Sequence, residues 1–165
     1  MSRFEPDSPD LPVVLDLLGR IQEIPLPALA EDWHETRWDA FATDEAEVQL
    51  FRGDSLLHGD VAPGNFLVGE TDSWAVDWAW PTRGAAFIDS ATLVLQLISA
   101  GHTPPAAEEL VSQCPGWSKS DPRAIDAFAR ANLRMFRSRA ERFPGQAWLR
   151  DMEATAKAWV DHRST

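Results

Sequence analysis

The stretch LLHGDVAPGNFLV, near the middle of the chain, carries two side chains suited to acid–base and metal chemistry. Asp60 stands at the start of a tight loop, and Asn65 follows it by five residues. An aspartate in this place can accept the proton of an attacking hydroxyl group. Pro63 and Gly64 favour a sharp turn, so we expect Asn65 to return beside Asp60.

A second acidic residue, Asp77, follows Asn65 by twelve residues and lies in the apolar run WAVDW. We expect this run to be a strand, and a carboxylate inside a strand core is costly unless it is paired or binds a cation. Aspartate and asparagine oxygens are hard ligands that suit Mg²⁺. Asp60, Asn65 and Asp77 together fit phosphoryl transfer, in which the protein mainly positions groups and neutralises charge. We therefore predict that the three side chains face one cavity and share a Mg²⁺ site.

The pattern resembles the aminoglycoside phosphotransferase and choline kinase superfamily, relatives of the protein kinases. The resemblance runs from about Leu56 to Ala91 at the level of motifs and, more loosely, over the whole chain as the C-terminal catalytic lobe. The matching positions are His58-Gly59-Asp60 and Asn65 in the catalytic loop, Val76-Asp77-Trp78 at the metal-binding strand end, and Gly84, Asp89 and Ala91 in a G-x-x-x-x-D-x-A pattern.

This resemblance implies a role for each matching side chain. Asp60 is the catalytic base, and Asn65 and Asp77 are Mg²⁺ ligands. Asp89 supports the backbone of the catalytic loop, so we expect it to be a buried carboxylate that accepts backbone N–H bonds there. His58 orients the loop rather than reacting. The implied reaction is transfer of a phosphoryl group from ATP, or another nucleoside triphosphate, to a small hydroxyl-bearing molecule such as an aminoglycoside.

The chain departs from the family pattern in two places. Ala79 and Ala85-Ala86 stand where relatives often carry an acidic residue and an Asp-Pro pair. More importantly, only about fifty residues precede the catalytic loop, and they contain no lysine. A kinase of this type needs an N-terminal lobe (N-lobe) with a phosphate-covering loop and a strand lysine. We therefore expect that the N-lobe is absent, that the isolated chain binds Mg²⁺-ATP weakly, and that its uncovered surface invites self-association or a partner chain.

The elements that must position these residues are read from hydrophobic periodicity. Residues 8–52 predict three helices: one with Pro12 in its first turn, a second over residues 31–41, and a short third after Thr43. Short β-prone runs fill residues 55–78, and helices return from Ala86 to the end. The expected fold class is α+β, mostly α: a protein-kinase-like C-terminal lobe with a small central β-hairpin that carries the catalytic loop, forming one domain over residues 1–165.

Composition restricts the possible partners and compartment. The net charge is −11 with an isoelectric point of about 4.7, which argues against a nucleic-acid partner because a phosphate backbone needs a basic face. No apolar run is long enough to span a membrane, and no secretory signal is evident, so the cytoplasm is the expected compartment. The single cysteine, Cys114, excludes an intramolecular disulfide.

Three classes of function stay open. The first is the catalytic lobe of a small-molecule kinase, and the second is a non-catalytic binding module that keeps the metal site of that lobe. The third is a purely structural helical protein, against which the intact Asp60, Asn65 and Asp77 argue. The absence of a strand lysine keeps the second class open. The nearby tryptophans Trp74, Trp78 and Trp80 are expected to fill the core.

Overall fold

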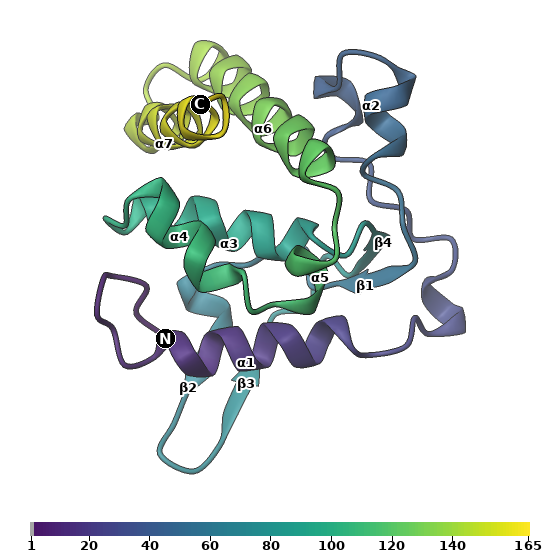
Figure 1. The fold of residues 1–165 in the computed structure, drawn as a ribbon, viewed down its shortest axis with the longest axis vertical. Helices are drawn as coiled ribbons and strands as arrows, with labels where there is room; N and C mark the ends of the chain where they lie inside the picture. Colours follow the sequence, from purple (N-terminus) through teal and green to yellow (C-terminus); the bar gives the residue numbers. More distant parts are fainter. Residues whose placement is uncertain (1) are drawn as a thin grey trace.

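Residues 2–165 are described by a computed structural model that is α+β and mostly helical, with two small sheets near the middle of the chain (Figure 1). The helices are α1 (Leu11–Gln22), α2 (Glu45–Gln49), α3 (Ile88–Ser99), α4 (Pro104–Val111), α5 (Pro115–Ser118), α6 (Pro122–Arg142) and α7 (Ala147–Arg163). The strands are β1 (Ser55–Leu57), β2 (Phe66–Val68), β3 (Ser73–Ala75) and β4 (Thr82–Gly84).

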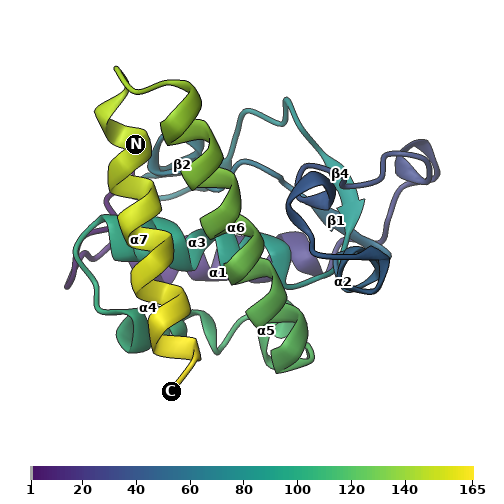
Figure 2. The same ribbon diagram turned by 90° about the horizontal axis from the view of Figure 1, so that it is seen from above.

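Helices α6 and α7 pack side by side in an antiparallel pair, joined by a short turn at residues 143–146 (Figures 1 and 2). Helix α3 packs beneath this pair and also against α4. Its apolar side chains are buried on nearly all sides, and the fully enclosed ones include Ile88, Leu93, Val94 and Leu97. Helix α1 lies on the far side of α3 and contacts β1, β2 and β3. The candidate loop therefore lies where the helical core meets the two sheets.

The two sheets divide the strand-rich region differently from the sequence-based prediction. Strand β1 pairs antiparallel with β4, and β2 pairs antiparallel with β3 in a hairpin that projects from the helical body (Figure 1). The candidate loop, residues 58–65, connects β1 of one sheet to β2 of the other. The prediction of a central hairpin is confirmed, but the loop precedes this hairpin instead of being carried within it.

Local sequence signals account for three of the helix ends. Pro12 lies in the first turn of α1, and Asp44 caps α2 by accepting the backbone N–H of Glu47. Gly101 follows α3 with φ of +107°, a conformation that closes a helix and that glycine adopts at little cost. Among the described helices, none is long and apolar enough to cross a membrane.

The helix predicted over residues 31–41 is wrong. This segment contains only a short 3₁₀ turn at Asp39–Phe41, and residues 33–35 run extended beside β4. The backbone N–H of Glu35 donates to the Arg83 carbonyl at 2.8 Å, and the N–H of Arg83 donates to the Trp33 carbonyl at 2.6 Å. Side chains that bond the nearby backbone compete with helix formation, and Glu35 does so by accepting the N–H of Arg37.

Candidate active site

Asp89 supports the loop as expected. It lies in the first turn of α3 and is 1% exposed. Its two carboxylate oxygens accept the backbone N–H groups of His58, at 2.7 Å, and of Gly59, at 3.1 Å. Burial raises the pKa of Asp89, although the two backbone hydrogen bonds and the charge of Arg37 oppose that rise. The predicted burial and backbone hydrogen bonds are thus both confirmed.

His58 connects the loop to the segment before Asp77. Its ring is fully buried, and Nε2 lies 2.8 Å from the Val76 carbonyl oxygen. A carbonyl can only accept, so Nε2 carries the proton, while Nδ1 accepts the N–H of Asp60 at 3.3 Å. Both ring nitrogens are therefore engaged by the backbone, an arrangement suited to orientation instead of proton transfer.

Asp60 and Asn65 come together at the two ends of the loop. The Asn65 side-chain amide donates to the Asp60 carboxylate at 2.9 Å and to the Asp60 carbonyl at 2.9 Å. Pro63 and Gly64 form a short 3₁₀ turn with Asn65, as their turn chemistry predicts. The Asp60 side chain is exposed and therefore open to a substrate.

Asp77 lies at this site, but not as the sequence predicted. Strand β3 ends at Ala75, so Asp77 follows the strand and is exposed instead of buried in a strand core. The backbone N–H of Val76 donates to the Asn65 carbonyl at 2.8 Å, which holds the Asp77 segment against the end of the loop. The argument that a buried Asp77 must bind a cation is therefore wrong.

A different feature singles out Asp77. Its φ of +58° is left-handed, a conformation shared among the described non-glycine residues only by Asp7. Such residues cost free energy and gather at functional sites, where the surrounding structure holds them in place. The left-handed turn at Asp77 follows directly on Val76, whose two backbone polar groups are held by Asn65 and His58.

The side chains at this site offer oxygen ligands of the type that a hard cation prefers. The side-chain N–H of Asn65 donates to Asp60, so the side-chain oxygen of Asn65 is free to act as a ligand atom. Asp77 adds an exposed carboxylate. Within residues 2–165, no three His, Cys, Asp or Glu side chains gather as a metal site. The candidate set differs from such clusters because one of its members is an amide. Convergence of all three side chains on one Mg²⁺ stays a prediction.

Arg37 contacts the loop, and the sequence-based prediction did not identify it. Its Nη1 donates to the Gly59 carbonyl at 2.5 Å, while its other edge pairs with the buried carboxylate of Glu35. The predicted helix over this segment concealed the contact. The only signal in the sequence is a Glu and an Arg two residues apart, which is too common to indicate a site.

The expectation that Trp74, Trp78 and Trp80 fill the core is wrong. Their exposed fractions are 55%, 38% and 64%. Trp78 packs its ring on His58, with centroids 4.7 Å apart, and shares with Trp74 and Ile24 a hollow of about 280 Å³ between α1 and the hairpin. These exposed rings leave apolar surface uncovered beside the hairpin.

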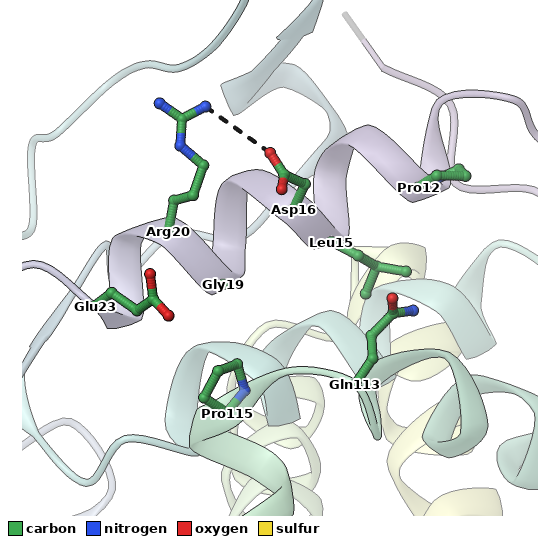
Figure 3. A pocket seen from close by; sticks show the side chains of 8 residues that line it. All are labelled: Pro12, Leu15, Asp16, Gly19, Arg20, Glu23, Gln113 and Pro115. Atoms are coloured by element: carbon green, nitrogen blue, oxygen red, sulfur yellow. Dashed lines mark ion pairs between the residues drawn. The ribbon is translucent and has the colours of Figure 1, made fainter.

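A second groove lies along α1 and faces Gln113 and Pro115, where the chain passes from α4 to α5 (Figure 3). It has a volume of about 430 Å³, and Asp16 and Arg20 at its edge form an ion pair at 3.9 Å. None of the candidate site residues lines this groove. It therefore adds nothing to the chemistry of the loop.

Comparison of the chain with protein-family models, curated proteins and solved structures finds no match in any of the three. Assignment of the site therefore rests on the motif spacing and on the geometry described above.

Proposed function

We propose that this chain is the C-terminal lobe of a protein-kinase-like phosphotransferase that transfers a phosphoryl group from ATP to a small hydroxyl-bearing molecule. The observation that carries the proposal is the pairing of Asp60 with Asn65 on a loop whose backbone is held by a buried Asp89. A rigid loop that presents one exposed carboxylate is what a general base needs, because proton transfer depends on a fixed position.

Each side chain has one task in this proposal. Asp60 accepts the proton of the attacking hydroxyl group, and the Asn65 amide keeps the Asp60 carboxylate aimed by donating to it. Asn65 and Asp77 would hold Mg²⁺ through their oxygens, and the ion would neutralise charge on the phosphoryl group being transferred. Asp89 holds the loop in place and does not contact the substrate.

Kinases of this type use a strand lysine to neutralise charge on the ATP phosphates, and the described residues supply no such lysine. The chain has two lysines: Lys119, at the end of α5, and Lys157, in α7, where it pairs with Asp161 at 2.6 Å. Neither is the strand lysine used by such kinases. We infer that residues 2–165 supply the base and the metal ligands and that phosphate binding is completed by an N-lobe or a partner chain.

A non-catalytic binding module is the second candidate. It is favoured by the hollow lined by Ile24, Trp74 and Trp78, since an apolar aromatic recess beside a metal site can bind a ligand without reacting with it. Turnover distinguishes the two candidates. A binding module keeps its affinity when Asp60 is replaced by Asn, whereas a phosphotransferase supplied with an N-lobe loses product formation.

The metal site is tested first, on the chain as it stands. Mn²⁺ is titrated in the presence of ATP, and paramagnetic broadening of backbone amide signals is followed by NMR. We expect broadening centred on Asn65 and Asp77 that is lost in Asp77→Asn. Asp72→Asn, which changes an exposed carboxylate in the hairpin turn, is the matched control and should leave the broadening unchanged. If the broadening persists unchanged in Asp77→Asn, the proposed metal site is wrong.

Catalysis is tested by calorimetry with Mg²⁺-ATP beside an ADP-release assay on aminoglycosides and other small alcohols. We expect a dissociation constant no better than millimolar, about −4 kcal/mol, and no turnover by the chain alone. Turnover that Asp60→Asn abolishes would show that the chain is a complete enzyme. Broadening at the metal site with no turnover, even after an N-lobe is supplied, would favour the binding module.

A further inference from the structure

A buried carboxylate lies behind the candidate loop. Glu35 is 2% exposed, and both of its oxygens accept N–H groups of Arg37: Nε donates at 3.0 Å to each oxygen, and Nη2 donates to one of them at 2.5 Å. The Arg37 backbone N–H and the Thr82 hydroxyl complete the shell at 2.8 Å and 2.9 Å. Burial alone would raise the pKa of Glu35, but the bonds and charge of Arg37 outweigh it and lower that pKa.

The free edge of the same guanidinium reaches the loop. Nη1 of Arg37 donates to the Gly59 carbonyl at 2.5 Å, and Nη2 lies 3.1 Å from the place where a Cβ on Gly59 would stand. Gly59 is left-handed, with φ of +78°. Its carbonyl belongs to the planar peptide group that ends in the N–H of Asp60, so holding this oxygen also fixes that N–H. The Asp60 N–H points to Nδ1 of His58 at 3.3 Å.

The guanidinium itself is held in one orientation. The carboxylate of Glu35 binds one edge in a fork, and the ring of Trp38, which is 6% exposed, lies 4.7 Å from the guanidinium carbon. A lysine could keep the charge beside Glu35, but one ammonium group cannot reproduce both edges of a planar guanidinium. The geometry therefore depends on an arginine at this position.

Two groups from distant parts of the chain thus hold consecutive polar atoms of one turn. Asp89 holds the N–H groups of His58 and Gly59, and Arg37 holds the carbonyl of Gly59. We propose that Arg37 is a positioning residue, which, backed by Glu35, fixes the peptide group between Gly59 and Asp60 and so aims the Asp60 side chain. What Asp60 does when aimed rests on the proposed function, but its placement by Arg37 does not.

The proposal is tested on the chain without metal or nucleotide, by amide hydrogen exchange and ¹⁵N shifts measured by NMR. In Arg37→Lys, which keeps a positive charge beside Glu35, we expect the Asp60 amide to exchange about tenfold faster. The ¹⁵N shift of His58 Nδ1 should move toward that of a nitrogen with no donor, because its bond from the Asp60 N–H is weakened. Amides in α6 should keep their exchange rates.

Arg83→Lys is the matched control. Arg83 also joins a carboxylate, Asp54, to backbone carbonyls, those of Gly53 and Glu31, but it has no bond to the loop. We expect this variant to leave both NMR signals of the loop unchanged. If Arg37→Lys lowers the unfolding midpoint but moves the loop signals no more than Arg83→Lys does, Arg37 is only structural and the proposal is wrong.

Arg37→Gln removes the charge as well, and it should accelerate exchange at Asp60 at least as much as Arg37→Lys. If Arg37→Gln does not fold, Arg37→Lys still decides, because it keeps Glu35 paired. Mn²⁺ and ATP are absent from this experiment, so failure of the phosphotransferase proposal would leave its result unaffected. Unchanged exchange at Asp60 in Arg37→Lys would likewise overturn only the positioning role.

Discussion

The two flanks of the candidate site are built in opposite ways. On the loop flank, His58 and Asp89 are buried, and consecutive backbone groups are bonded to side chains that come from distant parts of the sequence. On the hairpin flank, Asp77 is exposed and left-handed, and Trp78 and Trp80 stand beside it in solvent. The buried polar groups of the loop flank find their hydrogen-bond partners within the described residues, whereas the groups of the hairpin flank are exposed to solvent.

This difference separates stability from ligand binding. Buried polar atoms that are fully bonded hold a backbone in one conformation, and removing one partner is costly because the other is left unsatisfied. Exposed groups with little packing contribute little to stability, and a strained residue among them lowers it. Substitutions of the buried residues on the loop flank should therefore destabilise the fold, and those on the hairpin flank should alter binding without a loss of stability.

The largest effect is expected at Gly59. A methyl group there would collide with the Trp80 carbonyl, and the left-handed φ of +78° adds strain for any other residue. Gly59→Ala should lower the free energy of unfolding by about 3 kcal/mol, measured by urea denaturation. Gly64→Ala is the control, because a Cβ on Gly64 meets nothing within 4 Å. Equal losses in both variants would contradict the tight contact at Gly59.

Removal of the Asp89 side chain should have the next largest effect. Asp89→Ala leaves the buried N–H groups of His58 and Gly59 without their acceptor, so we expect a loss of about 2 kcal/mol or more in denaturant unfolding. Asp60→Asn, at an exposed position on the same loop, should change stability by less than about 0.5 kcal/mol. An unchanged midpoint in Asp89→Ala would show that these bonds do not support the loop.

Asp89 also predicts a pH dependence with a definite sign. Its pKa is raised above the ordinary 3.8, mainly by burial, so the folded chain holds this proton to higher pH than the unfolded chain does. The stability contributed by this group is full below the ordinary value and falls as the pH rises through the raised pKa. The stability of the wild type relative to Asp89→Asn, which cannot titrate, should therefore decrease with rising pH across that window. A stability difference between the wild type and Asp89→Asn that grows with rising pH would contradict a raised pKa for Asp89.

The hairpin flank should respond in the opposite direction. Asp77→Gly relieves a left-handed conformation, so it should raise the free energy of unfolding by up to about 1 kcal/mol while abolishing Mn²⁺ broadening at Asn65. Asp7→Gly is the matched control, since Asp7 has φ of +63° and is not part of the site. It should gain similar stability and keep the broadening. A loss of stability in Asp77→Gly would place Asp77 with the supporting residues.

The sequence by itself determined the parts of this protein whose information is local. Pro12 marked the first turn of α1, a short helix was expected after Thr43 where α2 begins, and Pro63 with Gly64 predicted the turn that brings Asn65 to Asp60. The expectation of a buried Asp89 bonded to the loop came from the resemblance of the motif to a known superfamily. These features depend on a few neighbouring residues or on a fixed pattern, so one sequence can indicate them.

Only the tertiary structure decided the features that rest on contacts between distant segments. Residues 33–35 pair with β4 although their sequence pattern is helical. This pairing satisfies backbone N–H and C=O groups of two segments that lie about fifty residues apart in the sequence, and it places Glu35 in a buried position. The same packing delivered Arg37 to Gly59. The ending of β3 at Ala75 left Asp77 in solvent, although its neighbours in the sequence are apolar. Whether a given residue is buried is set by what packs on it, and hydrophobic neighbours in the sequence do not determine that.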